Sequence, residues 1–169
     1  MRWIEIHRFL NGMWGGIVEA RETIQDLLAG TDFKVEEIEE VFGGYVYVEE
    51  KWEKMNYPYP AFEIKPGGEV GITPQGPYFV FVVPVEELSK SLLNEFIQNF
   101  KRAFVYGYQD FLKDFYSPQK SNANVLEEII KSREPAVQLE ADFESWNELF
   151  EGLLMMVELL KRHRVKWST

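Results

Sequence analysis

The longest run of regularly spaced apolar positions lies at the start of the chain. In residues 3–29 such positions recur every three or four residues and form one stripe, which predicts an amphipathic helix ending before Gly30. Gly12 and Gly16 are one turn apart in this helix, so they share a face and let another backbone approach closely. We therefore expect a close helix crossing at these two glycines.

Shorter segments also have helical spacing. In residues 33–42, Val35, Ile38 and Phe42 have helical spacing and four glutamates lie between them, which predicts a short helix with a solvated acidic face. The same spacing runs from Pro84 to about residue 104 and through residues 125–134. The pattern leaves open whether residues 104–116 form a strand or continue the preceding helix.

The clearest helix signal is near the C-terminus. Ser145 and Glu148 have the spacing of a capping box, in which each side chain accepts a hydrogen bond from the other residue's backbone amide. Leucine, methionine and valine then recur at helical spacing as far as residue 163. Apolar residues also lie off this main stripe, so the helix is expected to pack between two neighbours, one of them a second copy of the chain. The expected homodimer interface comprises Gly12, Gly16, Phe150, Leu154 and Met155.

Turn residues and β-branched or aromatic runs predict a series of strands between the helices. The predicted strands are residues 45–50, 61–65, 69–73, 78–83 and 136–143. Pro66-Gly67-Gly68 is expected to form the hairpin turn between the second and third. The fourth strand is apolar throughout and must be covered on both faces, whereas the last alternates strictly between apolar and polar residues.

These elements predict an α+β fold. We expect an antiparallel sheet of about five strands, with the long N-terminal helix, a central helix and the C-terminal helix packed on it. The chain has 169 residues, 46% of them hydrophobic, which suffices for one packed core. We therefore expect a single domain over residues 1–169.

Net charge narrows the range of partners. The chain carries 28 acidic and 18 basic residues, a formal net charge of −10. Because nucleic-acid binding needs several cations facing phosphates, nucleic acid is not an expected partner. The basic cluster Lys161, Arg162, Arg164 and Lys166 follows the last predicted helix, where cations complement the helix dipole.

Composition also restricts the cellular setting. The chain has no cysteine, which excludes disulfides and Cys-ligated zinc, and no apolar run reaches the ~20 residues of a membrane span. Glu5 and His7 interrupt the region where a signal peptide would need an apolar stretch. We therefore expect a cytoplasmic protein, and its many Glu and Lys residues suit a heat-adapted source.

Glu140 and Asp142 are the strongest candidates for chemistry. They lie two residues apart on the polar face of the last predicted strand, and paired carboxylates can perform acid–base catalysis. The same pattern arises on any half-exposed strand. His7 in the first helix is the third candidate, but no nucleophile elbow, phosphate loop or zinc motif accompanies these residues. We expect no metal and no cofactor.

An aromatic connection, residues 51–60, is a candidate partner site. Tyrosine and tryptophan offer large contact areas at a small cost in side-chain entropy and are frequent where proteins bind one another. The alternative is that these rings fold over the sheet edge as a satellite core. The candidate partner-binding residues are Trp52, Met55, Tyr57 and Tyr59.

The predicted elements occur in the order helix, strands, helix, strand, helix. The segments that show this order most clearly are "YFVFVVPVEELSKSLLNEF", and "AVQLEADF" followed by "ESWNELFEGLLMMVELL". Together with the acidic charge, this order resembles the type III secretion chaperone-like fold, including relatives outside secretion systems, over about residues 34–163. The resemblance implies a small acidic α+β homodimer that binds segments of other proteins and has no active site. The long glycine-bearing first helix and residues 109–135 depart from it.

The sequence therefore favours a non-enzymatic protein-interaction module, chaperone-like or adaptor-like, that binds a protein or peptide segment as a homodimer. The rival is an enzyme or small-ligand-binding protein that uses Glu140 and Asp142. A regulatory subunit that folds fully only with its partner is a third option.

Overall fold

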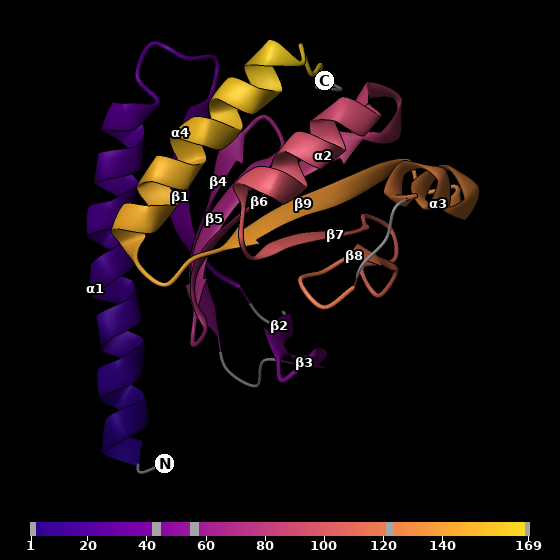
Figure 1. The fold of residues 1–169 in the computed structure, drawn as a ribbon. Helices are drawn as coiled ribbons and strands as arrows, with labels where there is room; N and C mark the ends of the chain where they lie inside the picture. The colour runs from indigo at the N-terminus through magenta and orange to yellow at the C-terminus, as the bar shows by residue number, and fades with distance from the viewer. Residues whose placement is uncertain (1–2, 42–44, 55–57, 121–123, 168–169) are drawn as a thin grey trace.

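The computed structural model describes residues 3–41, 45–54, 58–120 and 124–167, and Figure 1 shows an α+β fold. The helices are α1 (Trp3–Leu27), α2 (Lys90–Asn99), α3 (Val125–Ser132) and α4 (Trp146–Arg162), with a 3₁₀ turn at Val85–Glu87. The strands are β1 (Lys34–Val41), β2 (Tyr45–Val48), β3 (Lys51–Lys54), β4 (Tyr59–Lys65), β5 (Gly68–Thr73), β6 (Gly76–Pro84), β7 (Ala103–Gly107), β8 (Asp114–Tyr116) and β9 (Ala136–Asp142).

Seven of these strands form one antiparallel sheet in the order β1-β4-β5-β6-β9-β7-β8. The predicted α+β class with its antiparallel sheet and N- and C-terminal helices is thus confirmed, with two more strands than expected. β2 and β3 form a separate hairpin, so the predicted strand 45–50 does not join the main sheet. β6 is the central strand, and Phe79, Phe81 and Val83 are buried beneath the helices. On the other face Tyr78 and Val80 are buried but Val82 is only half-buried, so the expected cover of both faces is incomplete.

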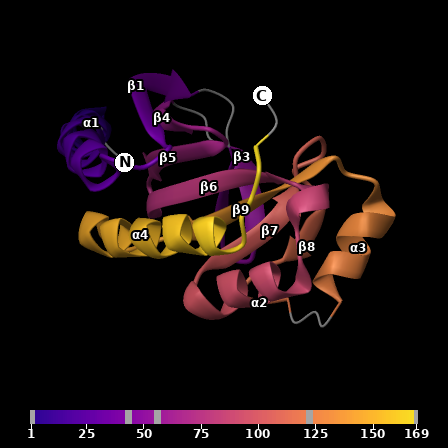
Figure 2. The same cartoon turned by 90° about the horizontal axis from the view of Figure 1, so that it is seen from above.

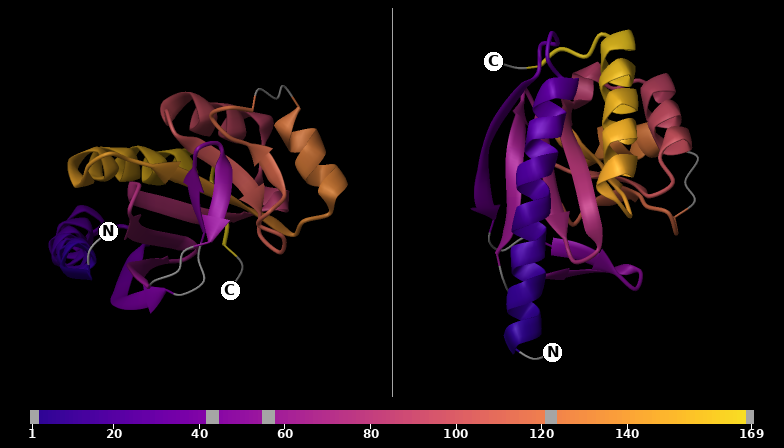
Figure 3. Two further views of the ribbon diagram at one scale, coloured as in Figure 1. Left: turned by 90° about the horizontal axis from the view of Figure 1, so that it is seen from below. Right: turned by 90° about the vertical axis from the view of Figure 1, so that its left-hand side faces the viewer.

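Helices cover one face of the sheet. Figure 2 shows α4 and α2 side by side along it, and Figure 3 shows α1 and α4 lying over the same side. Fully buried side chains of alternate strand positions point into this layer, among them Phe62, Ile64, Phe79, Phe81 and Leu139. Each is expected to contribute about 1.5–3 kcal/mol through removal of apolar surface from water.

The prediction of a helix over residues 33–42 is wrong, because residues 34–41 form strand β1. Val35 lies opposite Ile64, and Ile38 lies opposite Phe62, so three steps along β1 match two steps along β4. This irregularity brings Val35 and Ile38 to the same side of the sheet. A three-residue apolar spacing in a strand thereby imitates the spacing of a helix.

The helix predicted from Pro84 is shorter than expected. After the 3₁₀ turn the chain is extended at Leu88, and α2 begins only at Lys90. Ser89 caps it, because its hydroxyl accepts a hydrogen bond from the backbone amide of Leu92 at 3.0 Å. Beyond α2, residues 103–107 form strand β7. Of the two alternatives for residues 104–116, a strand or a continuation of the helix, the structure has a strand.

The capping box before α4 is present in a modified form. The Ser145 hydroxyl accepts a hydrogen bond from the Glu148 amide at 3.2 Å, as predicted. The Glu148 carboxylate accepts from the amide of Glu144 at 3.3 Å, not from that of Ser145. At the other end, Lys161 and Arg162 occupy the last turn, and Arg162 pairs with Glu95 of α2 at 2.5 Å.

Replacement of Ser145 by alanine is expected to destabilise the protein by about 1 kcal/mol, because the Glu148 amide loses its acceptor. Chemical denaturation followed by circular dichroism measures this loss. The control Ser145→Asp retains a capping oxygen and is expected to stay within a few tenths of a kcal/mol of the unmodified protein. Equal losses in both variants would show that the cap does not stabilise α4.

Candidate functional site

The face of the sheet opposite the helices carries a cluster of polar and aromatic side chains. Strand register brings them together: Val80 of β6 lies opposite Glu69 of β5 and Glu140 of β9, and Tyr78 lies opposite Asp142. We call this group the tyrosine–carboxylate cluster, and it comprises Tyr59, Glu69, Tyr78, Tyr106, Glu140 and Asp142.

Hydrogen bonds tie the cluster together. The Tyr78 hydroxyl donates to Oε2 of Glu69 at 2.9 Å, and the Tyr106 hydroxyl donates to Oε1 of Glu140 at 2.7 Å. The ring of Tyr59 meets that of Tyr78 edge to face, with centroids 6.4 Å apart. Arg102 approaches Asp142 from the end of the sheet at 3.8 Å.

Burial shifts the protonation of the cluster. It raises the pKa of Glu140 well above the ordinary glutamate value, and the neighbouring Asp142 carboxylate raises this pKa further. Burial also raises the pKa of Asp142, against the lowering effects of its hydrogen bond with Glu140 and the charge of Arg102. The pKa of Glu69 is raised for the same reason, and that of Tyr59 rises to about 12. Shifted carboxyl groups are typical of functional sites, although structural networks produce them too.

Glu140 and Asp142 therefore lie close together, as their spacing predicted, but the third predicted residue, His7, lies elsewhere. Glu140 and Asp142 interact directly in the cluster. His7 belongs to α1, which packs on the opposite face of the sheet, and its side chain lies outside the described residues. In the part of the chain that the structure describes, no three histidine, aspartate or glutamate side chains are grouped to hold a metal ion.

The β2–β3 hairpin covers one end of the cluster. The Trp52 ring lies 5.8 Å from the ring of Phe104 and 5.6 Å from that of Tyr106. Tyr59 is only 7% exposed. These two predicted partner-binding residues pack on the sheet, as the satellite-core alternative describes. Met55 and Tyr57 lie outside the described residues.

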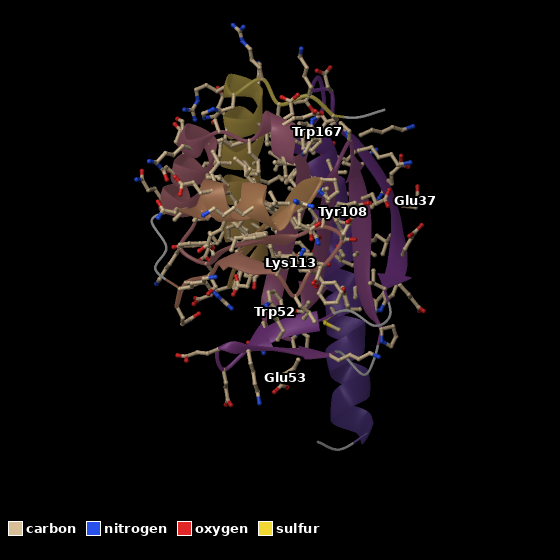
Figure 4. All side chains as sticks on the ribbon, turned by 90° about the vertical axis from the view of Figure 1, so that its right-hand side faces the viewer. Glu37, Trp52, Glu53, Tyr108, Lys113 and Trp167 are labelled. Atoms are coloured by element: carbon tan, nitrogen blue, oxygen red, sulfur yellow. The ribbon has the colours of Figure 1, made fainter. Side chains whose placement is uncertain are left out.

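Next to the cluster, on the same face, is a groove of about 610 Å³, which we call the open-face groove. Val80, Val82 and Gln138 form its floor, and Glu63 and Glu69 lie along one side. The β4–β5 turn, Tyr108 and Trp167 form its walls. Figure 4 shows Tyr108 between Trp52, on the hairpin, and Trp167, at the opposite end of the molecule.

Trp167 reaches the groove because Gly67 leaves room for it. A Cβ atom on Gly67 would lie 2.4 Å from the Trp167 ring, and the φ of +75° at Gly67 also favours glycine. The indole packs against the rings of Phe33 and Phe81, with centroids 6.5 and 6.3 Å away. The β4–β5 turn thus fixes the C-terminal tail at one end of the groove.

The residues predicted for a homodimer interface divide into two groups. Gly16 lies at a close crossing within the chain, where a Cβ atom would be 3.1 Å from Nε1 of Trp146 at the start of α4. Phe150 is half-buried and stacks on Trp146 at 6.3 Å. Gly12 has open space around it, and Leu154 and Met155 are 45% and 46% exposed.

The chain belongs to the family described as "Protein of unknown function (DUF3201)", whose model matches residues 8–155. It is similar to the solved structure of a conserved hypothetical protein from Pyrococcus furiosus, with 42% sequence identity and a TM-score of 0.90. The similarity covers 98% of this chain and 100% of that one. A search of curated proteins finds no match. Within the described residues, no helix combines the length and apolarity that crossing a membrane requires.

Proposed function

We propose that this protein is a non-enzymatic protein-interaction module, chaperone-like or adaptor-like, that acts in the cytoplasm as an acidic homodimer. The observation that carries the proposal is the open-face groove, a preformed concave surface on the side of the sheet that the helices leave free. Its partner is a segment of another protein.

The composition of the groove suits a peptide segment. Its floor is built from the rigid strands β6 and β9, so little ordering is needed when a partner binds. Tyr108 and Trp167 offer aromatic contact area at its walls, and Tyr108 is 53% exposed. The observed order is α1, β1 to β6, α2, β7 and β8, α3, β9 and α4, so α3 is a helix that the order of the secretion chaperone-like fold lacks, within the segment 109–135 that departs from it.

A capture experiment with matched variants tests the proposal. Val82→Lys places a bulky cation on the floor of the groove, whereas Ile130→Lys makes a similar change on α3, where Ile130 is 58% exposed. Tagged forms of both variants and the unmodified protein are incubated with an extract of the native source. A protein retained by the unmodified chain and by Ile130→Lys, but lost with Val82→Lys, is the expected result. Identical capture by all three would contradict the proposal.

The homodimer part of the proposal is supported by the apolar surface on α4. Leu154 follows Phe150 by one helical turn, and its side chain and that of Met155 are nearly half exposed. α4 lies on the helix-covered side of the sheet, so a dimer formed through it leaves the open-face groove accessible.

Replacement of Leu154 by glutamate is expected to convert the dimer to a monomer, because a charge would be buried in an apolar interface. Multi-angle light scattering during gel filtration measures the mass. Ile130→Glu, the same kind of change on α3, is expected to remain dimeric. A monomeric mass for the unmodified protein, or a dimer that survives Leu154→Glu, would contradict this interface.

A second candidate function, small-ligand binding or catalysis by Glu140 and Asp142, is favoured by one observation. Both carboxyl groups have raised pKa values in a buried cluster beside a groove. A small molecule that raises the melting temperature of the unmodified protein, but not of Glu140→Gln, would support it. Thermal shifts that are the same in both proteins would count against it.

A further inference from the structure

We infer that the open-face groove selects a basic segment, an extended stretch in which lysine or arginine side chains alternate with apolar ones. This inference rests on the proposed function and specifies its partner. It is drawn from the placement of charges, strands and aromatic rings around the groove.

Carboxyl groups lie in a row across the floor of this face. Glu63 of β4 lies opposite Glu69 of β5, Glu69 lies opposite Val80, and Val80 lies opposite Glu140. Glu63 and Glu69 line the groove from neighbouring strands, which lie about 4.8 Å apart. Successive side chains of an extended peptide point to opposite faces, so lysine or arginine at every second position puts all of its cations on the side that faces these two glutamates.

The acidic groups at the groove are not neutralised by its own lysine. Lys65 lies on the same side of the groove, but its ammonium group is 3.6 Å from Glu36 of β1. Glu63 is exposed, and Glu69 has a tyrosine hydroxyl as its partner. A cation from a partner would therefore add a charge that the groove lacks.

The aromatic walls favour the same chemistry. Tyr108 and Trp167 line the groove, and the faces of such rings attract lysine and arginine side chains. The net charge of −10 also draws cationic segments toward the molecule and speeds their encounter with it.

The chain's own tail has the same alternation. In Arg164-Val165-Lys166-Trp167, Val165 and Trp167 pack against the core, while Arg164 and Lys166 are exposed. Trp167 occupies one end of the groove.

Three fluorescein-labelled heptapeptides test the inference by fluorescence anisotropy: VKVRVKV, the neutral VQVQVQV and the acidic VEVEVEV. The basic peptide is expected to bind at least about tenfold more tightly than the neutral one, as several charge pairs would give. Glu63→Gln is expected to weaken binding of the basic peptide about two- to fivefold, the effect of one exposed charge pair. Val82→Lys is expected to abolish it. Glu158→Gln, the same charge change on the exposed side of α4, is the control and should leave binding unchanged.

Each other outcome overturns the inference. Equal binding of the basic and neutral peptides would show a groove without charge selectivity. Binding of the basic peptide that is unaffected by Glu63→Gln and Val82→Lys would show attraction to the net charge alone. Binding of none of the peptides would remove the basic segment as the partner. The proposed function fails separately, in the capture experiment, if Val82→Lys retains the same proteins as the unmodified chain.

Discussion

Replacement of Phe79 by alanine is expected to lower the free energy of unfolding by about 3–5 kcal/mol. Phe79 is fully buried on the central strand β6, and the rings of Phe81, Phe100 and Phe143 lie 5.7, 5.5 and 5.5 Å from its own. Since the sheet backbone forms one wall of the site, the cavity left by the ring closes only in part. For a typical domain stability of about 5–15 kcal/mol, this loss is a large fraction.

Denaturation by guanidinium chloride measures this effect. Phe111→Ala is the control, because Phe111 is 39% exposed and lies in the loop before β8, and it is expected to cost less than about 1 kcal/mol. Similar small losses in both variants would contradict the assignment of Phe79 to a packed core between the sheet and the helices.

Replacement of Glu140 by glutamine is expected to stabilise the protein above about pH 4.5, the ordinary pKa of a glutamate side chain. The folded state raises the pKa of Glu140, so it holds a proton that the unfolded chain has already lost. The free energy of unfolding therefore falls as the pH rises from that value through the folded-state pKa, and it is constant beyond. The slope approaches about 1.4 kcal/mol per pH unit for each proton. Glu140→Gln removes this titration and keeps an acceptor for the Tyr106 hydroxyl.

Denaturation curves at about pH 5 and about pH 8 measure this dependence. The unmodified protein is expected to lose stability between these values. Glu140→Gln is expected to lose less, because only Asp142 and Glu69 with their raised pKa values remain in the cluster to titrate, and to be the more stable of the two at the higher pH. Glu158→Gln, which removes an exposed charge from α4, is expected to follow the unmodified protein. A Glu140→Gln variant that is less stable than the unmodified protein at about pH 8 would show that the Glu140 charge stabilises the fold.

Strong local patterns predicted much of the fold. The last strand alternates strictly, and β9 places Val137, Leu139 and Ala141 toward the helices as that alternation requires. Ser145 marks the start of α4 because its capping hydrogen bond depends on neighbouring residues alone. Such features can be predicted from the sequence because the residues that determine them lie within a few positions of each other.

Other features depend on contacts between distant segments. In β1 the irregular pairing with β4 decides which side chains share a face, and residues 34–41 do not reveal it. The start of α2 differs from the prediction for another reason: helical spacing begins after Pro84, but those residues form a 3₁₀ turn and α2 begins only after the Ser89 cap.

The candidate site could be predicted only in part. The pairing of Glu140 with Asp142 follows from their spacing within one strand. Their meeting with Tyr106 and Glu69 depends on the strand order β5-β6-β9-β7, for which the chain has no local signal. The groove is less predictable still, because its walls come from the β4–β5 turn, from Tyr108 and from Trp167.

The central claim is that a partner binds on the face of the sheet that the helices leave free. A photo-crosslinking amino acid introduced at Val82, on the floor of the groove, tests it most directly; the exposed Glu127 on α3 serves as the matched control position. Irradiation in an extract of the native source is expected to join position 82, but not position 127, to a protein, with the adduct mapping to a basic segment. Adducts at position 127 with none at position 82 would place the interaction outside the groove and contradict the claim.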